Sequence, residues 1–498
     1  MNVLRTKSIE QSLEDTEDVE FKLKKGLTAL DLTVFGIGVV IGAGIFTLTG
    51  KVASQYAGPG VVFSFLLAAI CCALAALCYA EFASTVPVAG SAYTFSYATL
   101  GELVAWIIGW DLILELMLGA SVVAQGWSTY LVTFLDEIGI TWPSSVGPVD
   151  SAEFSWGHFN LAAVLLVLVL TTLIAIGIKE SLRVNLFLVA IKLFIVLFVI
   201  IAGLFYVTGA NYHPFIPPAA DPVESSGLTQ PLLQWVLGVQ PQTFGVLGII
   251  SAASVVFFAY IGFDVVATTA EEANNPQKDL PKGILGSLAI CTVLYMAVAL
   301  VITGMVPYDK IDPNAALATA FTSVGKDGFA TMIAAGAVAG LTTVVMTLMI
   351  GAVRVLFAMS RDGLLPTAFA HTNPKTGTPV RITLTIGAMV AVIAGFTPIE
   401  KLEEMVNIGT LTAFLLVSLA VPILRRTRPD LERPFKVPLS PYLPVLAALV
   451  CLYLMLNLTV ETWLRFVVWM AIGFIIYFAY GHRHSRVRLA EQAEASAS

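Results

Sequence analysis

The feature that most constrains this sequence is a series of apolar runs, each long enough to cross a lipid bilayer. A transmembrane helix needs roughly 20 apolar residues. Such runs lie at 29–50, 61–81, 100–130, 159–178, 184–207, 245–266, 283–305, 329–353, 380–397, 405–424, 441–459 and 463–480. The chain is therefore predicted to be an all-α polytopic membrane protein with twelve transmembrane helices.

Composition also indicates a lipid environment. Hydrophobic residues make up 57% of the chain and charged residues 12%, whereas a soluble chain is about a quarter charged. Every cysteine lies within an apolar run: Cys71, Cys72, Cys78, Cys291 and Cys451. We therefore expect no disulfide and no metal site. The N-terminal stretch lacks the apolar core of a signal peptide.

The distribution of basic residues predicts the orientation, because Lys and Arg accumulate in cytoplasmic loops. With the N-terminus inside, 21 of the 27 Lys and Arg residues fall in cytoplasmic segments, five fall outside, and Lys192 lies within a span. This bias predicts a multi-pass protein of the cell (cytoplasmic) membrane with both termini cytoplasmic. Residues 1–28 would form a cytoplasmic N-terminal segment, largely disordered, and 481–498 a cytoplasmic tail.

Glycines interrupt the first run, FGIGVVIGAGIFTLTG, at Gly36, Gly38, Gly42 and Gly44. One interpretation is helix packing, since Gly38 and Gly42 form a GxxxG face that another helix can approach. The other is a helix that unwinds near Gly42, because glycine costs about 1 kcal/mol relative to alanine. Unpaired backbone at membrane depth persists only where it lines a cavity.

The sixth run, VVFFAYIGFDVVATTAEE, is interrupted in the same way by Gly262, with Asp264 close behind it. The first and sixth runs open two halves of five runs each. Matching interrupted helices in two such halves point to a substrate site at the middle of the membrane. This pairing favours broken helices, with the repeat itself inferred from spacing alone.

Two broken helices would suit a zwitterion. A half-helix N-terminus offers free N–H groups and a partial positive charge to a carboxylate, and a half-helix C-terminus offers free carbonyls to an ammonium group. Neither interrupted stretch supplies a basic side chain. The pattern is therefore typical of an α-amino acid site.

Lys192 lies far from any polar neighbour within the fifth run, in LFLVAIKLFIVLF. A basic residue at a helix centre costs about 2.5–3.5 kcal/mol on insertion scales. It could extend to the membrane interface, or its ammonium group could contact backbone carbonyls of the broken first helix in place of a sodium ion. Because a desolvated lysine can lose its proton, the position could also couple transport to protons. The sequence leaves sodium coupling open.

Two buried acids could balance Lys192: Asp264 behind the second break, and Glu115 in GWDLILELMLG, one turn after Asp111. Each is either a static partner of a buried polar group or a proton carrier. Catalytic triads, metal-ligand spacings and phosphate loops are absent from the sequence. We therefore predict a transporter rather than an enzyme, with no nucleic-acid partner and no cofactor other than protons as the coupling ion.

Four loops carry distinctive motifs: 78–102, 271–284, 359–366 and 425–446. Their Pro, Gly and paired charges are consistent both with short helices that form a gate and with ordinary charged loops. With GIGVVIGAGIF and FFAYIGFD, they give the chain its likeness to a known family. From about residue 24 to 482 the sequence resembles the amino acid–polyamine–organocation (APC) permeases, specifically bacterial relatives of the cationic amino acid transporter (CAT) branch.

This resemblance implies a LeuT-like fold. Residues 29–207 and 245–424 would be two inverted five-helix repeats, and 441–480 would hold two extra helices. The substrate carboxylate would meet the backbone around Gly42, Ala43, Gly44 and Ile45. The α-ammonium would meet carbonyls near Val40 and Ile41 and, in the sixth run, near Phe258, Ala259, Ile261 and Gly262.

Further roles follow from the same resemblance. Lys192, Asp264 and Glu115 match positions linked to proton coupling, and Phe258 would cover the substrate. Met346 and Met349 of the eighth run are candidates for the side-chain pocket, although Met is also ordinary core filler. A pocket containing Thr and Met rather than acids favours small neutral substrates or broad specificity.

The predicted function is thus secondary active transport of L-amino acids by alternating access, as proton symport. The alternatives are an exchanger of cationic amino acids or polyamines, and a sensor that binds amino acids without moving them. The expected partners are the amino acid and membrane lipid. An accessory small membrane subunit cannot be read from the sequence.

Overall fold

The computed structural model describes residues 5, 26–85, 91–148, 159–177, 182–220, 227–238, 243–373, 377–489 and 492. Within these ranges every regular element is helical, and β-structure is limited to two isolated bridges. Most of the segment 1–28 and most of the tail after 489 lie outside the described residues. The predicted disorder of these two segments therefore stays a prediction.

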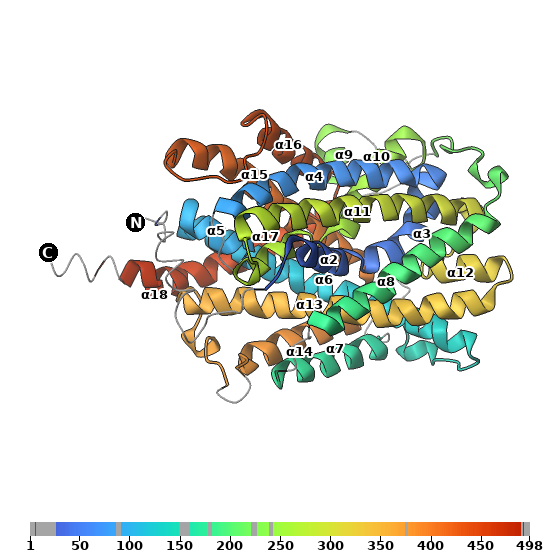
Figure 1. Ribbon diagram of the computed structural model, residues 1–498, viewed down its shortest axis with the longest axis horizontal. Helices are drawn as coiled ribbons and strands as arrows, with labels where there is room; N and C mark the ends of the chain where they lie inside the picture. The colour runs from blue at the N-terminus through green and yellow to red at the C-terminus, as the bar shows by residue number, and fades with distance from the viewer. Residues whose placement is uncertain are drawn as a thin grey trace.

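The larger helices follow the predicted apolar runs. They are α2 (Ala29–Val40), α4 (Val61–Thr85), α6 (Glu102–Glu137), α7 (Leu161–Ala175), α8 (Leu182–Gly203), α10 (Gly245–Val256), α11 (Pro276–Met305), α13 (Asp327–Arg361), α14 (Val380–Phe396), α15 (Ile399–Thr427), α16 (Tyr442–Leu456) and α17 (Val460–Ile476). Short helices join them, including α3 (Thr49–Val52), α5 (Ser91–Thr99), α9 (Leu232–Leu237), α12 (Ala316–Ser323) and α18 (His482–His484). Most of the long helices run along the long axis of the molecule (Figure 1).

Helix length and composition fit a membrane. In the described part of the chain, eight helical stretches are long and apolar enough to cross one, and α2, α7, α14 and α16 are shorter apolar helices. The first predicted run is divided between two of these elements. Its first part is α2, while its second part belongs to the stretch Gly44–Thr85, which continues into α4.

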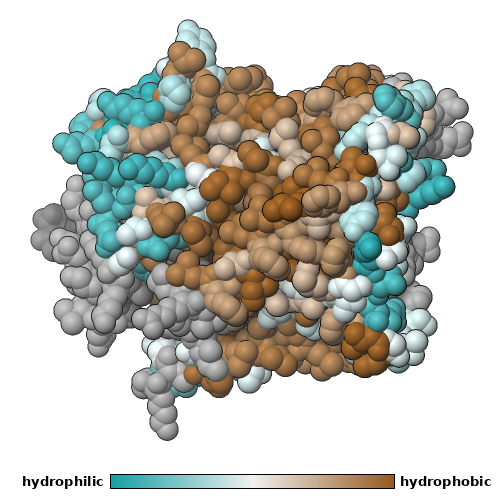
Figure 2. All heavy atoms as spheres, turned by 45° about the vertical axis from the view of Figure 1, so that its right-hand side comes forward, coloured by the Kyte–Doolittle hydropathy of each residue, from teal (hydrophilic) through white to brown (hydrophobic). Residues whose placement is uncertain are grey.

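The exposed surface of the molecule is apolar over a wide area. Figure 2 shows a broad apolar band across the middle of the visible face, with hydrophilic residues gathered towards its two ends. Phe187 and Ile201 of α8 and Val293 of α11 are among the many large apolar side chains that are exposed. An apolar surface of this extent is unsuited to water. The chain is an integral membrane protein.

The helix α6 runs through the interior and carries polar groups there. Of the 18 residues in the most apolar stretch of this helix, 94% are buried, because α13, α14 and α15 pack around it. Asp111 and Glu115 of α6 are consequently buried. This helix, α13 and the two interrupted helices position the candidate site.

The two ends of the described chain meet at Glu102, the first residue of α6. Its buried carboxylate accepts hydrogen bonds from the hydroxyls of Tyr97 (3.2 Å), Tyr477 (2.9 Å) and Ser485, and its N–H donates to the carbonyl of Arg5 at 2.8 Å. Burial and the Glu102 carboxylate raise the pKa of the Tyr97 hydroxyl, so this group remains a donor. Both chain ends therefore lie on one side of the molecule.

Three of the four distinctive loops contact one another on this side. Tyr93 of α5 donates to Asp362 Oδ2 at 2.8 Å, which links the loops 78–102 and 359–366. Arg425 at the end of α15 donates to both carboxylate oxygens of Glu81 at 2.9 and 2.6 Å, and the Val437 N–H donates to the same carboxylate at 2.6 Å. These contacts join the loops 78–102 and 425–446. Hydrogen bonds and an ion pair therefore fix the positions of these loops relative to one another.

Candidate functional site

The first predicted break is present. The helix α2 ends at Val40, Ile41 leaves helical geometry at φ −71° and ψ 86°, and a wide helical turn begins at Gly44. Glycine is required at this point, because a Cβ on Gly44 would lie 2.2 Å from the Cα of Ala259. The first break therefore touches the second one directly.

The second break surrounds Gly262. The helix α10 ends at Val256, a 3-10 turn covers Phe257–Tyr260, and Ile261 is extended at φ −62° and ψ 136°. Gly262 has φ +114°, which only glycine adopts readily. A tight 3-10 segment, Asp264–Glu272, then continues the chain. The interruption that the sequence predicts here is confirmed.

One tyrosine joins the two breaks. The hydroxyl of Tyr295, on α11, lies 2.6 Å from the Val40 carbonyl oxygen and 2.9 Å from that of Ala259, and donates its single proton to this pair. Both carbonyls end helical segments and lack the usual intrahelical partner. Sequence reasoning missed Tyr295, because it sits in the apolar run ICTVLYMAVALV with no motif around it.

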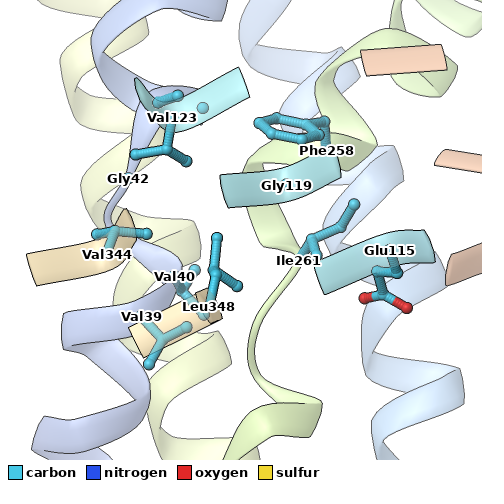
Figure 3. A pocket seen from close by; sticks show the side chains of 12 residues that line it. Val39, Val40, Gly42, Glu115, Gly119, Val123, Phe258, Ile261, Val344 and Leu348 are labelled. Carbon is cyan, nitrogen blue, oxygen red and sulfur yellow. The ribbon is translucent and has the colours of Figure 1, made fainter. Parts of the chain in front are cut away.

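A cavity lies where the two breaks face α6 and α13 (Figure 3). It is narrow, with a cavity volume of about 20 Å³. Its lining is Val39, Val40, Gly42, Ala43, Gly44, Glu115, Gly119, Val123, Phe258, Ile261, Val344 and Leu348. Apart from Glu115 these residues offer backbone and apolar side chains, so the cavity suits an apolar group attached to a polar one.

The predicted site residues divide into two groups. Those that line the cavity are Val40, Gly42, Ala43, Gly44, Glu115, Phe258 and Ile261. Those that lie outside the lining are Ile41, Ile45, Ala259, Gly262, Lys192, Asp264, Met346 and Met349. Four of the eight residues in the second group, Ile41, Ile45, Ala259 and Gly262, are next to lining residues in the two breaks, so the breaks that the sequence predicts border the cavity.

The two methionines are replaced in the lining by their neighbours on α13. Met346 and Met349 are buried, but Val344 and Leu348 face the cavity. Residues four apart share one face of a helix, whereas a residue two positions away points to the opposite side. The sequence does not reveal which face this is, because α13 is apolar on nearly all sides around these positions.

Lys192 contacts the first broken helix. Its side chain is 1% exposed, and its Nζ donates to the Gly38 carbonyl at 2.6 Å. Gly38 lies two residues before the end of α2. The predicted contact with a carbonyl of the first helix is present, and extension of Lys192 to the membrane interface is not what this structure has.

Three buried acids lie near the cavity. Glu115 interacts electrostatically with Asp264 and Asp111, and all three are at most 2% exposed. Within the described part of the chain, neither oxygen of Glu115 or Asp111 has a hydrogen-bond partner, nor does Oδ1 of Asp264. Ionisable groups in such surroundings inside a membrane protein are candidates for proton pathways.

Comparison with known proteins identifies the family. The family model described as amino acid permease matches residues 27–480. This chain belongs to the amino acid permease family. The resemblance to APC permeases is confirmed, and the protein is an amino acid transporter rather than an enzyme.

Relatives of this permease have different names. It is 46% identical to the branched-chain amino acid permease BcaP of Bacillus subtilis (strain 168), over 98% of this chain and 99% of that protein. It is 44% identical to the methylthioribose transporter of the same organism, over 93% and 95%. It is 36% identical to the vacuolar cationic amino acid transporter 4 of Arabidopsis thaliana, over 86% and 68%.

The permease also carries an ion cluster at the other end of the broken first helix. Lys51 of α3 contacts Glu400 Oε1 at 3.2 Å and Glu403 Oε2 at 3.1 Å, both on α15. Glu403 is almost buried, while Glu400 is about half exposed. The cluster joins the segment after the first break to α15 on the side away from the chain ends.

Proposed function

We propose that this permease is a secondary active transporter that moves L-amino acids across the cytoplasmic membrane by alternating access. In this proposal its twelve apolar helices adopt a LeuT-like arrangement. Residues 29–207 and 245–424 form two inverted five-helix repeats, 441–480 form two further helices, and both termini are cytoplasmic. The pairing of breaks in the first and sixth runs supports this arrangement.

One observation carries the proposal: the two breaks meet at one cavity, Gly44 against Ala259, with peptide groups free of the helical pattern on both sides. The N–H groups of the turn that begins at Gly44 suit a carboxylate. The carbonyls of Val40 and Ala259, which now accept from Tyr295, suit an ammonium group. A zwitterionic amino acid satisfies both sets.

The apolar lining supports neutral aliphatic substrates. Val123, Val344 and Leu348 lie on one side of the cavity, and Phe258 and Ile261 lie on the other (Figure 3). A guanidinium or second ammonium group buried there would need several polar partners, and Glu115 is the acidic residue of the lining. The likeness to a branched-chain amino acid permease agrees with this choice.

Proton coupling is the proposed driving force, with Lys192 as the central group. Its ammonium on the Gly38 carbonyl occupies a position where a sodium ion would otherwise neutralise the end of a broken helix. Loss of its proton would remove this charge from α2. Glu115 and Asp264 would accept or pass on protons in the same region.

The test is uptake into proteoliposomes of a labelled panel that includes leucine, alanine and arginine, with and without an inward pH gradient. We expect leucine to accumulate only with the gradient, and Lys192→Ala to keep binding but lose this accumulation. Gradient-independent uptake that needs internal substrate would instead establish an exchanger. Binding without flux would establish a sensor, and sodium-dependent accumulation would replace protons as the coupling ion.

A further inference from the structure

The Lys192 side chain lies against α13 as well as α2. A Cβ built on Gly340 of α13 would be 2.8 Å from Lys192 Cγ and 3.5 Å from both Cδ and Cε. The lysine stem therefore runs across the bare backbone of Gly340 before its ammonium group reaches Gly38. Glycine at 340 is what provides the space for this path.

Two other glycines fix the position of α8 around Lys192. A Cβ on Gly38 would lie 2.5 Å from Val189 Cγ2, and a Cβ on Gly336 would lie 2.4 Å from Ile195 Cγ1. Val189 and Ile195 are three residues before and after Lys192, so both lie about one turn from it. Small residues allow this close approach of helices. The backbone of Lys192 is thus held between α2 and α13 with little freedom to move.

The same face of α13 reaches the cavity. Gly336, Gly340, Val344 and Leu348 follow one another at intervals of four residues, so they lie along one side of the helix. Val344 and Leu348 line the cavity, while Gly340 carries the lysine stem. A movement of α13 relative to α2 therefore changes the lining of the cavity and the surroundings of the Lys192 side chain at the same time.

We propose that Gly340 is a positioning residue for ion coupling. Its lack of a side chain lets Lys192 reach the Gly38 carbonyl, and it links that contact to the face of α13 that borders the substrate. The proposal rests on the coupling role of Lys192 proposed above. A methyl group at 340 displaces Cγ, an atom near the root of the side chain, so rotation of the distal stem cannot relieve the contact.

The titratable groups around Lys192 bear on any pH measurement. The buried thiol of Cys291, on the packed helix α11, interacts electrostatically with Lys192. The contacts from α2 and α13 described above are made by glycines, which do not titrate. Cys291→Ala is therefore included in every background to separate the thiol from the lysine.

The experiment compares Gly340→Ala with Gly351→Ala, the same change at another glycine of α13, where the added Cβ would contact Leu116 of α6 at 3.4 Å and would not meet α8. Purified permease in proteoliposomes is assayed for leucine accumulation under a pH gradient, for leucine counterflow at equal pH, and for the pH profile of the initial rate. We expect Gly340→Ala to lose accumulation by about tenfold or more, the effect of one lost hydrogen bond to a charged group. Its pH profile shifts while counterflow persists. Gly351→Ala keeps the wild-type profile.

A double variant completes the test. In Lys192→Ala the stem beyond Cβ is gone, so adding Gly340→Ala should cause no further loss in any readout, a clear failure of additivity. If Gly340→Ala alone fails to fold, Lys192→Ala should restore folding for the same reason. Additive losses, or no restoration, would overturn the positioning role.

The outcomes distinguish the two proposals. Wild-type accumulation and pH profile in Gly340→Ala, together with a defective Lys192→Ala, would refute the role of Gly340 and leave the proposed function intact. Full accumulation in Lys192→Ala would refute the proposed coupling itself. In that case both proposals fail, because the positioning role of Gly340 depends on the coupling role of Lys192.

Discussion

The contact of Tyr295 with both breaks gives the sharpest prediction about substrate binding. Its hydroxyl donates to the Val40 and Ala259 carbonyls, and the proposed substrate ammonium uses the same oxygens. Tyr295→Phe removes the donor and leaves the ring in place. The substitution should therefore lower the stability of the substrate-free protein more than that of the substrate-bound protein.

The magnitude follows from burial. Tyr295 is 0% exposed, and an unsatisfied buried polar group costs about 1–3 kcal/mol. Because one shared proton serves both carbonyls, we expect the free energy of unfolding of the substrate-free protein to fall by about 1–3 kcal/mol in total. A bound ammonium group supplies three donors and can satisfy both carbonyls. Most of the loss should then disappear at saturating substrate.

The assay is thermal unfolding of the purified permease with and without saturating leucine. The expected result is a larger leucine-induced stabilisation in Tyr295→Phe than in wild type. Tyr130→Phe is the control, since its buried hydroxyl donates to Phe46 at 2.7 Å, away from the proposed ammonium position. Equal losses in Tyr295→Phe with and without leucine would show that substrate does not use these carbonyls.

Three further predictions concern separate parts of the molecule. Gly44→Ala should abolish transport, because its Cβ would lie 2.2 Å from Ala259 Cα, backbone that cannot yield without separating the breaks; uptake by a variant that still folds measures this. Leu348→Ala should weaken leucine transport by about tenfold or more while admitting phenylalanine, since each methylene in a pocket is worth about 1–3 kcal/mol; competition uptake tests it, and an unchanged substrate order would contradict it. Glu81→Gln should lower stability by about 1–3 kcal/mol through loss of the pair with half-buried Arg425, while unfolding temperatures equal to wild type would show that the pair contributes nothing.

Much of the architecture was readable because bilayer thickness and charge costs act on sequence directly. Apolar runs of the required length became helices, and Gly262 marked a break because its φ of +114° needs glycine. Lys192 was recognisable since a buried cation must find partners. In each case an unfavourable free energy restricts which residues can stand at that position, so the local sequence alone indicates the structure.

The rest depends on which side of a helix faces inward. Val344 and Leu348 line the cavity in place of Met346 and Met349, and an apolar helix among apolar neighbours and lipid carries no pattern that distinguishes these faces. Tyr295 and Gly340 act through long-range contacts with α2 and α8. No motif in the residues next to Tyr295 or Gly340 indicates these contacts.

The carboxylate of Glu102 has a consequence for biosynthesis. Two of its donors, Tyr477 and Ser485, follow it by 375 and 383 residues. At about 5–20 residues per second, a ribosome needs roughly 20–80 s to deliver them. During that interval the start of α6 is incomplete, so this corner of the permease closes only when the last stretch of chain has been made. A polypeptide that stops short of Tyr477 keeps the Tyr97 donor but lacks the other two hydroxyls, so part of the cost of burying this carboxylate is left uncompensated.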